Sequence, residues 1–375
     1  MTLRAGIDAR FASARYDGVG RYVAELAGEL ARRDGEPVVC LLRPADGDPP
    51  RHALPEASAH GGRVVDLRAR RALRAESPWS SLEIPRLARQ ARADVWHTPF
   101  PLAPLRTGAP SVITLHDCIP ERYPHYFGAS RRAVYRAWVA AAARRARLVL
   151  VPSELSAEDA QHYHRIPARR LRVTPEGVSP APPADPAAEG AMRRRLGIDG
   201  GYLLTVGRPR PHKGYALLVR ALARIEAARR PLLVRVGRDD PRLPDGSAQL
   251  AAELGVRLLA LQGLSDAELL AVYRGALLVA VPSAVEGFGL PLLEAMAAGT
   301  PVLAAAIQPF RATGGEVARL VDGFDESAWA SAVSDSIGDN AWLEAARREG
   351  PRRAARFPWS ACAEATLDAY REAAS

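Results

Sequence analysis

Lysine, asparagine and cysteine are scarce in this chain of 375 residues. Lys213 is the single lysine among 51 basic residues and Asn340 is the single asparagine, which indicates a coding bias towards arginine. The three cysteines (Cys40, Cys118 and Cys362) are too few and too widely spaced for a disulfide framework or a metal cluster. Few cysteines are typical of a reducing compartment, so we expect a cytoplasmic protein.

Long apolar segments are also lacking. The first ten residues have no apolar core of a signal peptide, and no run of about 18 apolar residues occurs. The most apolar helical stretch, residues 133–150, is interrupted by several arginines. We therefore expect neither export nor a membrane-spanning helix.

Charge and apolar content are both high. A hydrophobic content of 48% supports sizeable cores and excludes wholesale disorder. The net charge of +9 suits an anionic partner, which could be a nucleotide, a phosphorylated lipid, a membrane surface or nucleic acid. Net charge alone does not distinguish these partners. The arginine-rich helices of the N-terminal half are compatible with peripheral contact with a membrane.

Short apolar segments alternate with helical patterns along the whole chain. Such alternation is typical of α/β proteins, in which helices cover both faces of a parallel sheet. In the first half, strands are expected at residues 3–8, 38–42, 64–67, 95–97, 112–116, 148–152 and 171–174. In the second half they are expected at residues 202–206, 232–236, 256–260, 277–281 and 302–305.

A proline-rich stretch separates the two halves. It indicates a linker at 181–190 that follows an N-terminal domain (1–180) and precedes a C-terminal domain beginning at residue 191. Two such halves predict a ligand cleft at the carboxyl ends of the strands.

The segment from Pro282 to Pro301 carries the strongest chemical signal. A strand ends there, and a loop with Gly287 and Gly289 leads into a helix through Pro291. The N–H groups at the start of such a helix bind phosphate, and glycine lets the backbone approach a ligand closely. Two carboxylates, Glu286 and Glu294, bracket the loop and are suited to accept hydrogen bonds from sugar hydroxyls.

Basic residues follow the first strand of the second half. Gly207 and Arg208 come directly after this strand, and Lys213 stands five residues beyond Arg208, across a proline-stiffened turn. Two cations at this spacing can converge on one anion, such as a departing diphosphate. A lysine that survives a bias towards arginine also indicates a position where the broader guanidinium does not fit.

Two further segments stand at predicted strand ends of the first half. His116 with Asp117 ends an apolar strand, where an imidazole either touches substrate or bonds to its neighbour in the core. Gly18 and Gly20 follow the first strand as a G-x-G pattern without the third glycine of the dinucleotide fingerprint.

Metal sites find little support in the sequence. Asp46 and Asp48 match a D-x-D pattern but fall in a proline-rich loop, and His162 with His164 has no nearby third ligand along the chain. We therefore expect no metal.

In this order and at these separations, the motifs resemble the retaining glycosyltransferases of family 4. The E-x7-E segment from Glu286 to Glu294 is the most specific match, and Gly207-Arg208 with Lys213-Gly214 is the second. The resemblance covers nearly the whole chain and is strongest to a bacterial mannosyltransferase-like branch that builds polysaccharides. It implies the GT-B fold, with two Rossmann-like doubly wound parallel-sheet domains facing across a cleft. The N-terminal domain would bind the acceptor and the C-terminal domain (191–357) the nucleotide sugar, and a C-terminal helix (358–375) would return to the N-terminal domain.

The resemblance also implies roles for individual residues. Arg208 and Lys213 would hold the donor diphosphate, and Glu294 would bond the ribose. Glu286 and the N–H groups of Phe288, Gly289 and Leu290 would hold the donor sugar and phosphate. His116 would contact the sugar, Gly18 and Gly20 would let the N-terminal loop close, and the stretch around Leu264 would line the base pocket.

The expected function is retaining transfer of a hexose from GDP-mannose or a UDP-hexose. The acceptor is a saccharide, a lipid-linked sugar or a small molecule, and neither a cofactor nor nucleic acid is expected. A GT-B phosphorylase with Lys213 bound to pyridoxal phosphate, a nucleic-acid-binding protein and a non-catalytic nucleotide-sugar-binding partner remain alternatives.

Overall fold

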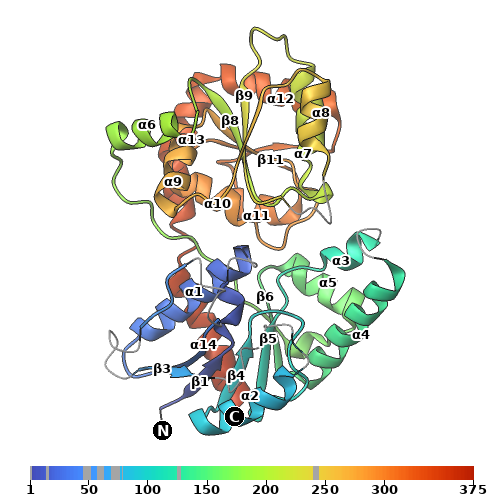
Figure 1. The fold of residues 1–375 in the computed structure, drawn as a ribbon, viewed down its shortest axis with the longest axis vertical. Coiled ribbons are helices and arrows are strands. Elements are labelled where there is room, and N and C mark those ends of the chain that lie inside the picture. The colour runs from blue at the N-terminus through green and yellow to red at the C-terminus, as the bar shows by residue number, and fades with distance from the viewer. Residues whose placement is uncertain are drawn as a thin grey trace. The chain divides into compact units, whose positions relative to one another are not determined.

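The computed structural model describes residues 2–13, 17–44, 52–56, 63–68, 77, 79–124, 128–239 and 245–375. The chain forms two compact units (Figure 1). Unit 1 comprises Met1–Gly177 and Trp359–Ser375, and unit 2 comprises Val178–Pro358. Each unit has its own parallel sheet and its own hydrophobic core, as the alternating sequence pattern predicts.

The sheet of unit 1 has seven parallel strands in the order β3-β2-β1-β4-β5-β6-β7. Its inner strands β4 and β6 are buried along their whole length because helices cover both faces of a parallel sheet. The strands are β1 (Arg4–Ile7), β2 (Val38–Leu42), β3 (Val64–Leu67), β4 (Val95–Thr98), β5 (Ser111–Thr114), β6 (Leu148–Val151) and β7 (Leu171–Val173).

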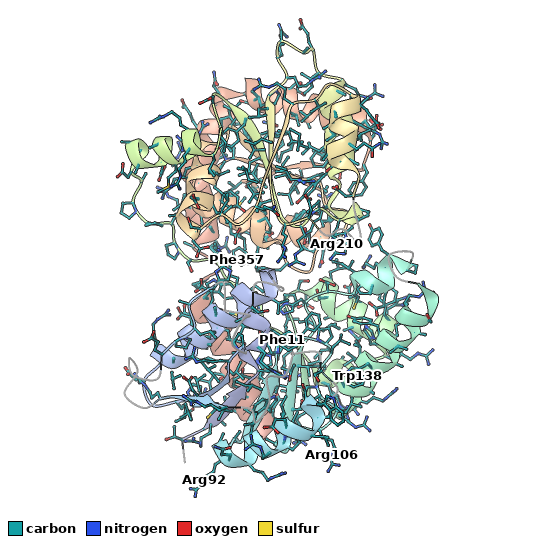
Figure 2. The ribbon with its side chains drawn as sticks, viewed as in Figure 1. Phe11, Arg92, Arg106, Trp138, Arg210 and Phe357 are labelled. Carbon is teal, nitrogen blue, oxygen red and sulfur yellow. The ribbon has the colours of Figure 1, made fainter. Side chains whose placement is uncertain are left out.

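The helices of unit 1 follow the strands in the usual alternation. They are α1 (Asp17–Arg32), α2 (Ser80–Ala91), α3 (Ile119–Arg122), α4 (Ala129–Arg145), α5 (Glu154–His164) and α14 (Trp359–Ala374), with 3₁₀ helices η1 (Ala9–Ala12) and η4 (Ala168–Arg170). Phe11 of η1 lies inside the unit and stacks on Phe100, with ring centroids 5.1 Å apart (Figure 2).

The last helix of the chain, α14, belongs to unit 1 and packs against α1 and the sheet (Figure 1). A series of buried hydrogen bonds holds α14 there. The hydroxyl of Tyr370 lies 2.7 Å from Nδ1 of His97 in β4, and Nε2 of His97 lies 2.7 Å from the hydroxyl of Thr114 in β5. Burial lowers the pKa of His97 to about 3, so its ring is neutral.

Unit 2 has six parallel strands in the order β10-β9-β8-β11-β12-β13. The strands are β8 (Tyr202–Val206), β9 (Leu232–Val236), β10 (Leu258–Leu261), β11 (Leu278–Val281), β12 (Val302–Ala305) and β13 (Arg319–Val321). The helices are α6 (Pro186–Arg195), α7 (Tyr215–Ala223), α8 (Ser247–Glu253), α9 (Asp266–Gly275), α10 (Leu290–Ala297), α11 (Gln308–Gly314), α12 (Glu326–Gly338) and α13 (Asn340–Ala354), with the 3₁₀ helix η5 (Pro211–Lys213).

The linker expected at 181–190 is too long, because helix α6 begins inside it. The Asp185 side chain accepts a hydrogen bond from the backbone N–H of Ala188, and Pro186 occupies the first helical position. Aspartate followed by proline is a helix-start signal that the surrounding prolines concealed. Arg274 of α9 pairs with Glu189 and so ties α6 to unit 2.

Among the described residues, none of the helices combines the length and the apolar content needed to cross a bilayer.

Candidate active site

The strand order of each sheet reverses at one point, between β1 and β4 in unit 1 and between β8 and β11 in unit 2. Loops that leave the carboxyl ends of strands at such a point diverge to opposite faces and open a space for a ligand. In unit 2, the loop after β8 carries Lys213 and the loop after β11 carries Glu286. Two of the predicted motifs therefore meet at the switch point of this sheet.

Lys213 and Glu286 form a close ion pair. Nζ of Lys213 lies 2.6 Å from Oε1 of Glu286, and the two side chains are 17% and 11% exposed. Burial acts to raise the pKa of Glu286, but the Lys213 ammonium, with smaller effects from His212 and Ser283, holds this pKa below its ordinary value. Glu286 is therefore ionised at neutral pH and keeps Lys213 in place.

Gly207 lets the Lys213 side chain lie over the backbone after β8. Its φ is +135°, and a Cβ built there would lie 3.1 Å from the Tyr215 hydroxyl and 3.8 Å from Cε of Lys213. The Tyr215 hydroxyl donates to the Gly207 carbonyl at 3.2 Å, which fixes the turn. Arg208 follows directly and is half-buried. Arg210 precedes η5 in the same loop (Figure 2).

The loop after β11 ends at Gly289, which caps helix α10 with φ +104°. A Cβ at this position would lie 2.7 Å from the ring of Phe310, so both backbone conformation and space require glycine. Phe288 is buried, and its ring packs edge-on to Phe357. The helix that begins at Leu290 thus presents its first N–H groups at the carboxyl edge of the sheet, an arrangement suited to an anion.

Glu294 lies one turn into α10. Its Oε2 accepts a hydrogen bond from the hydroxyl of Tyr273 in α9, at 2.8 Å. This bond orients a half-buried carboxylate that the sequence predicted as a sugar-binding group. Leu264, predicted to line the base pocket, is buried in the turn that leads into α9.

In unit 1, His116 lies two residues beyond β5, and both of its ring nitrogens have protein partners. Nδ1 lies 2.8 Å from Oε1 of Glu176, and Nε2 lies 3.1 Å from the carbonyl oxygen of Pro99. Burial acts to lower the pKa of His116, but Glu176 outweighs it and raises this pKa. Because both partners are hydrogen-bond acceptors, they favour the protonated ring, which donates from both nitrogens.

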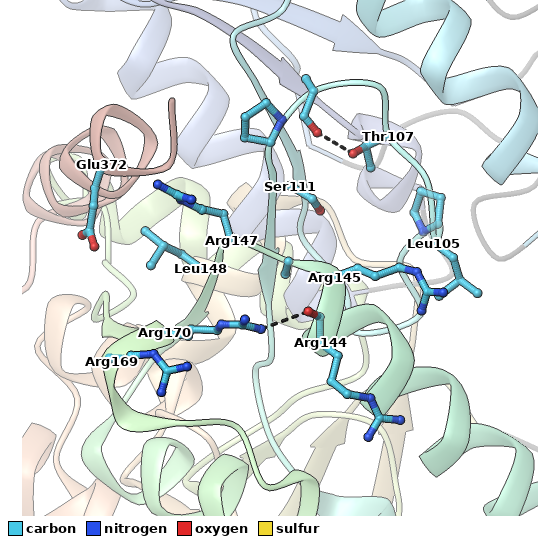
Figure 3. A pocket seen from close by; sticks show the side chains of 14 residues that line it. Leu105, Thr107, Ser111, Arg144, Arg145, Arg147, Leu148, Arg169, Arg170 and Glu372 are labelled. Carbon is cyan, nitrogen blue, oxygen red and sulfur yellow. Dashed lines mark hydrogen bonds between the residues drawn. The ribbon is translucent and has the colours of Figure 1, made fainter. Parts of the chain in front are cut away.

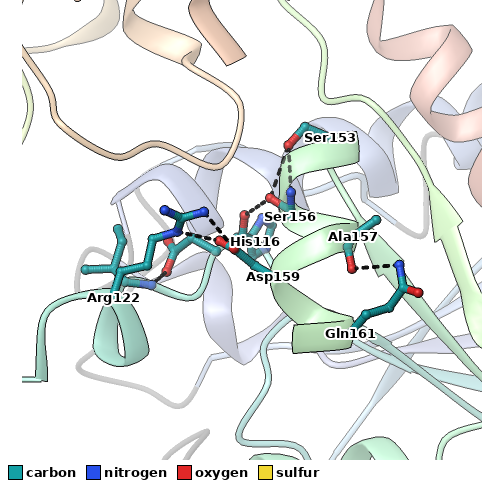
Figure 4. Close-up of polar contacts among 9 residues, drawn as sticks. His116, Arg122, Ser153, Ser156, Ala157, Asp159 and Gln161 are labelled. Carbon is teal, nitrogen blue, oxygen red and sulfur yellow. Dashed lines mark hydrogen bonds and ion pairs between the residues drawn. The ribbon is translucent and has the colours of Figure 1, made fainter. Parts of the chain in front are cut away.

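The surroundings of His116 explain its position. Tyr22 of α1 packs edge-on to its ring, with centroids 4.9 Å apart. The Ser156 hydroxyl donates to the backbone carbonyl of His116 at 3.2 Å (Figure 4). Both ring nitrogens of His116 are therefore held within unit 1, one of them by Glu176. Sequence reasoning missed that partner, Glu176, because it follows β7 and stands 60 residues away in the chain.

Gly18 and Gly20 were expected in a loop, and the structure corrects this. Helix α1 begins at Asp17, so both glycines lie in its first turn. A Cβ at Gly20 would lie 3.3 Å from the carbonyl oxygen of Ala12, whereas a Cβ at Gly18 would meet nothing within 4 Å. Gly20 lets α1 start close against η1, while Gly18 has open space. The D-x-D pattern of Asp46 and Asp48 lies outside the described residues.

Unit 1 also contains an arginine-lined cavity of about 600 Å³ (Figure 3). It lies at the amino ends of β5 and β6, where Ser111 and Leu148 begin these strands, and thus at the edge opposite His116. The guanidinium of Arg170 donates to the Arg144 carbonyl at 2.9 Å. The basic lining comes from the end of α4 and from η4, namely Arg144, Arg145, Arg147, Arg169 and Arg170.

Solved structures share this fold. Sucrose-phosphate synthase from Thermosynechococcus elongatus superimposes with a TM-score of 0.76 at 23% identity, covering 99% of both chains. Anabaena HepE in complex with UDP-glucose superimposes with a TM-score of 0.73 at 20% identity, covering 99% of this chain and 100% of HepE. The fold is therefore that of the GT-B glycosyltransferases, as predicted.

Family models place the chain within that class. Residues 16–182 match the model described as Glycosyltransferase Family 4, and residues 191–353 match Glycosyl transferases group 1. The chain belongs to glycosyltransferase family 4, a family of transferases, which confirms the resemblance found in the sequence.

Curated relatives carry one recurrent name. The D-inositol 3-phosphate glycosyltransferase of Rhodococcus opacus is 36% identical over 244 residues, which cover 60% of this chain and 53% of the relative. The protein of the same name from Thermobispora bispora is 39% identical over 230 residues, covering 56% and 52%. The chain thus spans about half the length of the curated relatives it matches.

Proposed function

We propose that the protein transfers a hexose from a nucleoside diphosphate donor to an acceptor hydroxyl, with retention of anomeric configuration. The bond between the anomeric carbon and the diphosphate breaks, and the acceptor oxygen forms the new bond on the same face. The acceptor proton passes to the departing phosphate oxygen, so nucleoside diphosphate and glycoside are the products. Family membership and the site of unit 2 support this reaction.

The Lys213–Glu286 pair is the observation that carries the proposal. Lys213 supplies a positive charge where the diphosphate would gain negative charge, and Glu286 fixes it at 2.6 Å before the donor arrives. A charge held in position needs no reorganisation during the reaction, which is the source of its effect on rate. Arg208 would add a second cation from the same loop, and the start of α10 would add N–H donors.

Other residues of unit 2 would orient the donor. Glu294, held by Tyr273, would accept hydrogen bonds from the ribose hydroxyls. Glu286 and the N–H groups of Phe288, Gly289 and Leu290 would hold the hexose and the phosphate beside it, and Leu264 would contact the base. In unit 1, His116 would contact the sugar, and its bond to Glu176 would fix the orientation of the ring.

Donor and acceptor are proposed from two sources. GDP-mannose or a UDP-hexose is the donor that the sequence resemblance favours, and HepE was solved with UDP-glucose. The acceptor is a saccharide, a lipid-linked sugar or a small molecule. The name of the curated relatives adds D-inositol 3-phosphate as a small-molecule candidate.

Transfer is proposed to need neither a cofactor nor a metal at the diphosphate. Lys213 and Arg208 bring the charges that a metal would otherwise supply. Activity should therefore be the same with magnesium, with manganese or with no added divalent metal. A strict requirement for either ion would contradict this part of the proposal.

The decisive experiment is a panel of nucleoside diphosphate sugars, scored by thermal shift and by slow hydrolysis of each donor. One donor should raise the melting temperature and be hydrolysed without an acceptor, and that donor should then glycosylate one acceptor class. Near-visible absorbance of bound pyridoxal phosphate would instead favour the phosphorylase. Donor binding without turnover on any acceptor would favour a non-catalytic partner.

Nucleic-acid binding can be separated from these outcomes. Binding of DNA that weakens steeply with salt, without hydrolysis of any nucleotide sugar, would favour a basic nucleic-acid-binding protein. We expect donor hydrolysis and no specific nucleic-acid complex.

We also propose a cytoplasmic protein that touches the inner membrane surface peripherally. The three cysteines are unpaired and buried, which fits a reducing compartment. The arginine-lined cavity offers guanidinium groups to lipid phosphates, each worth about 1 kcal/mol near an anionic surface. The double variant Arg145→Glu/Arg169→Glu should lose sedimentation with phosphatidylglycerol vesicles, while Arg229→Glu in unit 2 should retain it. Equal binding to phosphatidylcholine vesicles would contradict the contact.

A further inference from the structure

Three side chains of metal-binding type meet in unit 1. Cys118 precedes the short helix α3, Glu121 lies within it, and His164 is the last residue of α5. Their potential ligand atoms all lie within 4.8 Å of one another. Along the chain they are separated by up to 46 residues (164 − 118), and only the fold brings them together.

The cluster is buried, and its polar atoms lack hydrogen bonds. The side chains of Glu121 and His164 are each 1% exposed, and Cys118 is buried as well. Within the described part of the chain, neither carboxylate oxygen of Glu121 nor Nε2 of His164 has a hydrogen-bond partner. Nε2 of His164 lies 3.3 Å from Oε1 of Glu121, so these two atoms point into the same small space.

Among the described residues, the neighbouring cations form no hydrogen bond with the Glu121 carboxylate or with Nε2 of His164. The guanidinium of Arg122, next to Glu121 in sequence, turns to Asp159 and donates to both of its carboxylate oxygens at 2.7 Å (Figure 4). The positive charge of Arg136 acts on both Glu121 and His164 without such a bond. A buried carboxylate and an imidazole nitrogen that lack hydrogen bonds cost several kcal/mol in general, unless something binds them. A group that accepts lone pairs from sulfur, oxygen and nitrogen together would remove this cost.

We propose that Cys118, Glu121 and His164 form a zinc site. Thiolate, carboxylate and imidazole are the ligand types that zinc takes in proteins, and three protein ligands leave a fourth position for water or the second Glu121 oxygen. Zinc–ligand bonds of about 2.0–2.3 Å put neighbouring ligand atoms roughly 3.3–3.7 Å apart. Side-chain movements of about 1 Å therefore close the observed cluster onto an ion.

The chemistry of the three side chains suits a divalent cation. Such a cation binds a thiol and a carboxyl group in their deprotonated forms, and it takes an imidazole in its neutral form.

The site would have a structural role for the loop that follows β5. Cys118 stands two residues after His116, and His164 ends the helix that also carries Ser156, whose hydroxyl bonds to the His116 carbonyl. Zinc would join α3 to α5 directly beside this histidine. Along the chain, His162 with His164 lacks a third ligand, and the fold supplies two ligands for His164 from a distant segment.

Zinc alone is the probe. The full chain is treated with a chelator, desalted, loaded with zinc chloride, desalted again and assayed for metal and for thermal unfolding. We expect one zinc per chain and a higher melting temperature. Loading with cobalt instead should give a thiolate-to-metal charge-transfer band, which reports a cysteine ligand and should be absent in Cys118→Ser.

Matched variants separate this site from adventitious binding. Cys118→Ser and His164→Ala should weaken zinc binding by more than the roughly 10- to 100-fold that loss of an outer partner causes. Cys362→Ser removes another buried thiol and His162→Ala removes the exposed neighbouring histidine, and both should keep the metal. The proposal would be overturned if the wild-type protein retained no zinc. It would also be overturned if Cys118→Ser and His164→Ala retained as much zinc as the wild-type protein.

Discussion

The ammonium of Lys213 lies 2.6 Å from a carboxylate oxygen of Glu286, although the two residues are 73 positions apart in the chain. The pair joins the loops that leave β8 and β11, the two strands at which the sheet of unit 2 reverses its order. The single lysine of the sequence thus lies at the switch point of the sheet, where parallel sheets bind their ligands.

Replacing Lys213 by arginine tests why a lysine is kept there. Its Cε lies close over Gly207 and its ammonium contacts Glu286, so a broader guanidinium has little room. Lys213→Arg should lower kcat by about tenfold or more, a loss of roughly 1.4 kcal/mol in transition-state stabilisation. The reverse exchange at an exposed site, Arg229→Lys, should leave kcat unchanged. Full activity of Lys213→Arg would show that this position does not require lysine.

Glu286→Gln tests the electrostatics of the pair. The pKa of Glu286 is lowered in the folded protein, so its contribution to stability is complete above its ordinary value near 4.5. That contribution is lost as pH falls through the folded-state pKa. The variant should be less stable by about 1–3 kcal/mol at pH 7. Unfolding in urea at several pH values should show the difference vanish in acid.

The His116–Glu176 contact predicts that stability depends on pH in the direction opposite to that expected for Glu286. The folded-state pKa of His116 is raised, so its contribution to stability is complete below about 6.5 and is lost as pH rises through the raised value. Glu176→Gln should lower the pKa of His116, measured by NMR titration of the ring. It should also remove the fall in stability above pH 6.5. Glu158→Gln, an exposed carboxylate on α5, should change neither.

Gly289→Ala tests the conformation of the donor loop. Its φ of +104° opposes a side chain, and so does the Phe310 ring, which would lie 2.7 Å from the added methyl group. The variant should lose about 1–3 kcal/mol of stability and bind donor more weakly. Gly338→Ala at the end of α12, where a Cβ meets nothing within 4 Å, should be tolerated. Equal behaviour of the two variants in urea unfolding and donor titration would contradict the account of this loop.

Local patterns explain what could be predicted from the sequence. The strands β8 and β11 and the glycine before α10 each depend on neighbouring residues, so periodicity and turn signals find them. The α/β architecture follows from the alternation of these elements.

Contacts between distant segments could not be predicted in the same way. Glu176 holds His116 across 60 residues, and no local signal links them. Cys118 and His164 meet only because α3 and α5 follow adjacent parallel strands, β5 and β6. The start of α6 was missed for a local reason, because proline was taken as a sign of a linker where it starts a helix.

Steady-state kinetics of Lys213→Ala with the cognate donor is the most direct measurement of the proposed role of the Lys213–Glu286 pair. If Lys213 stabilises the departing diphosphate, kcat should fall by about 10² to 10³, with a smaller change in KM for the donor. Arg229→Ala, which removes an exposed charge of the same unit, should keep wild-type values. Near-normal kcat in Lys213→Ala would contradict the account.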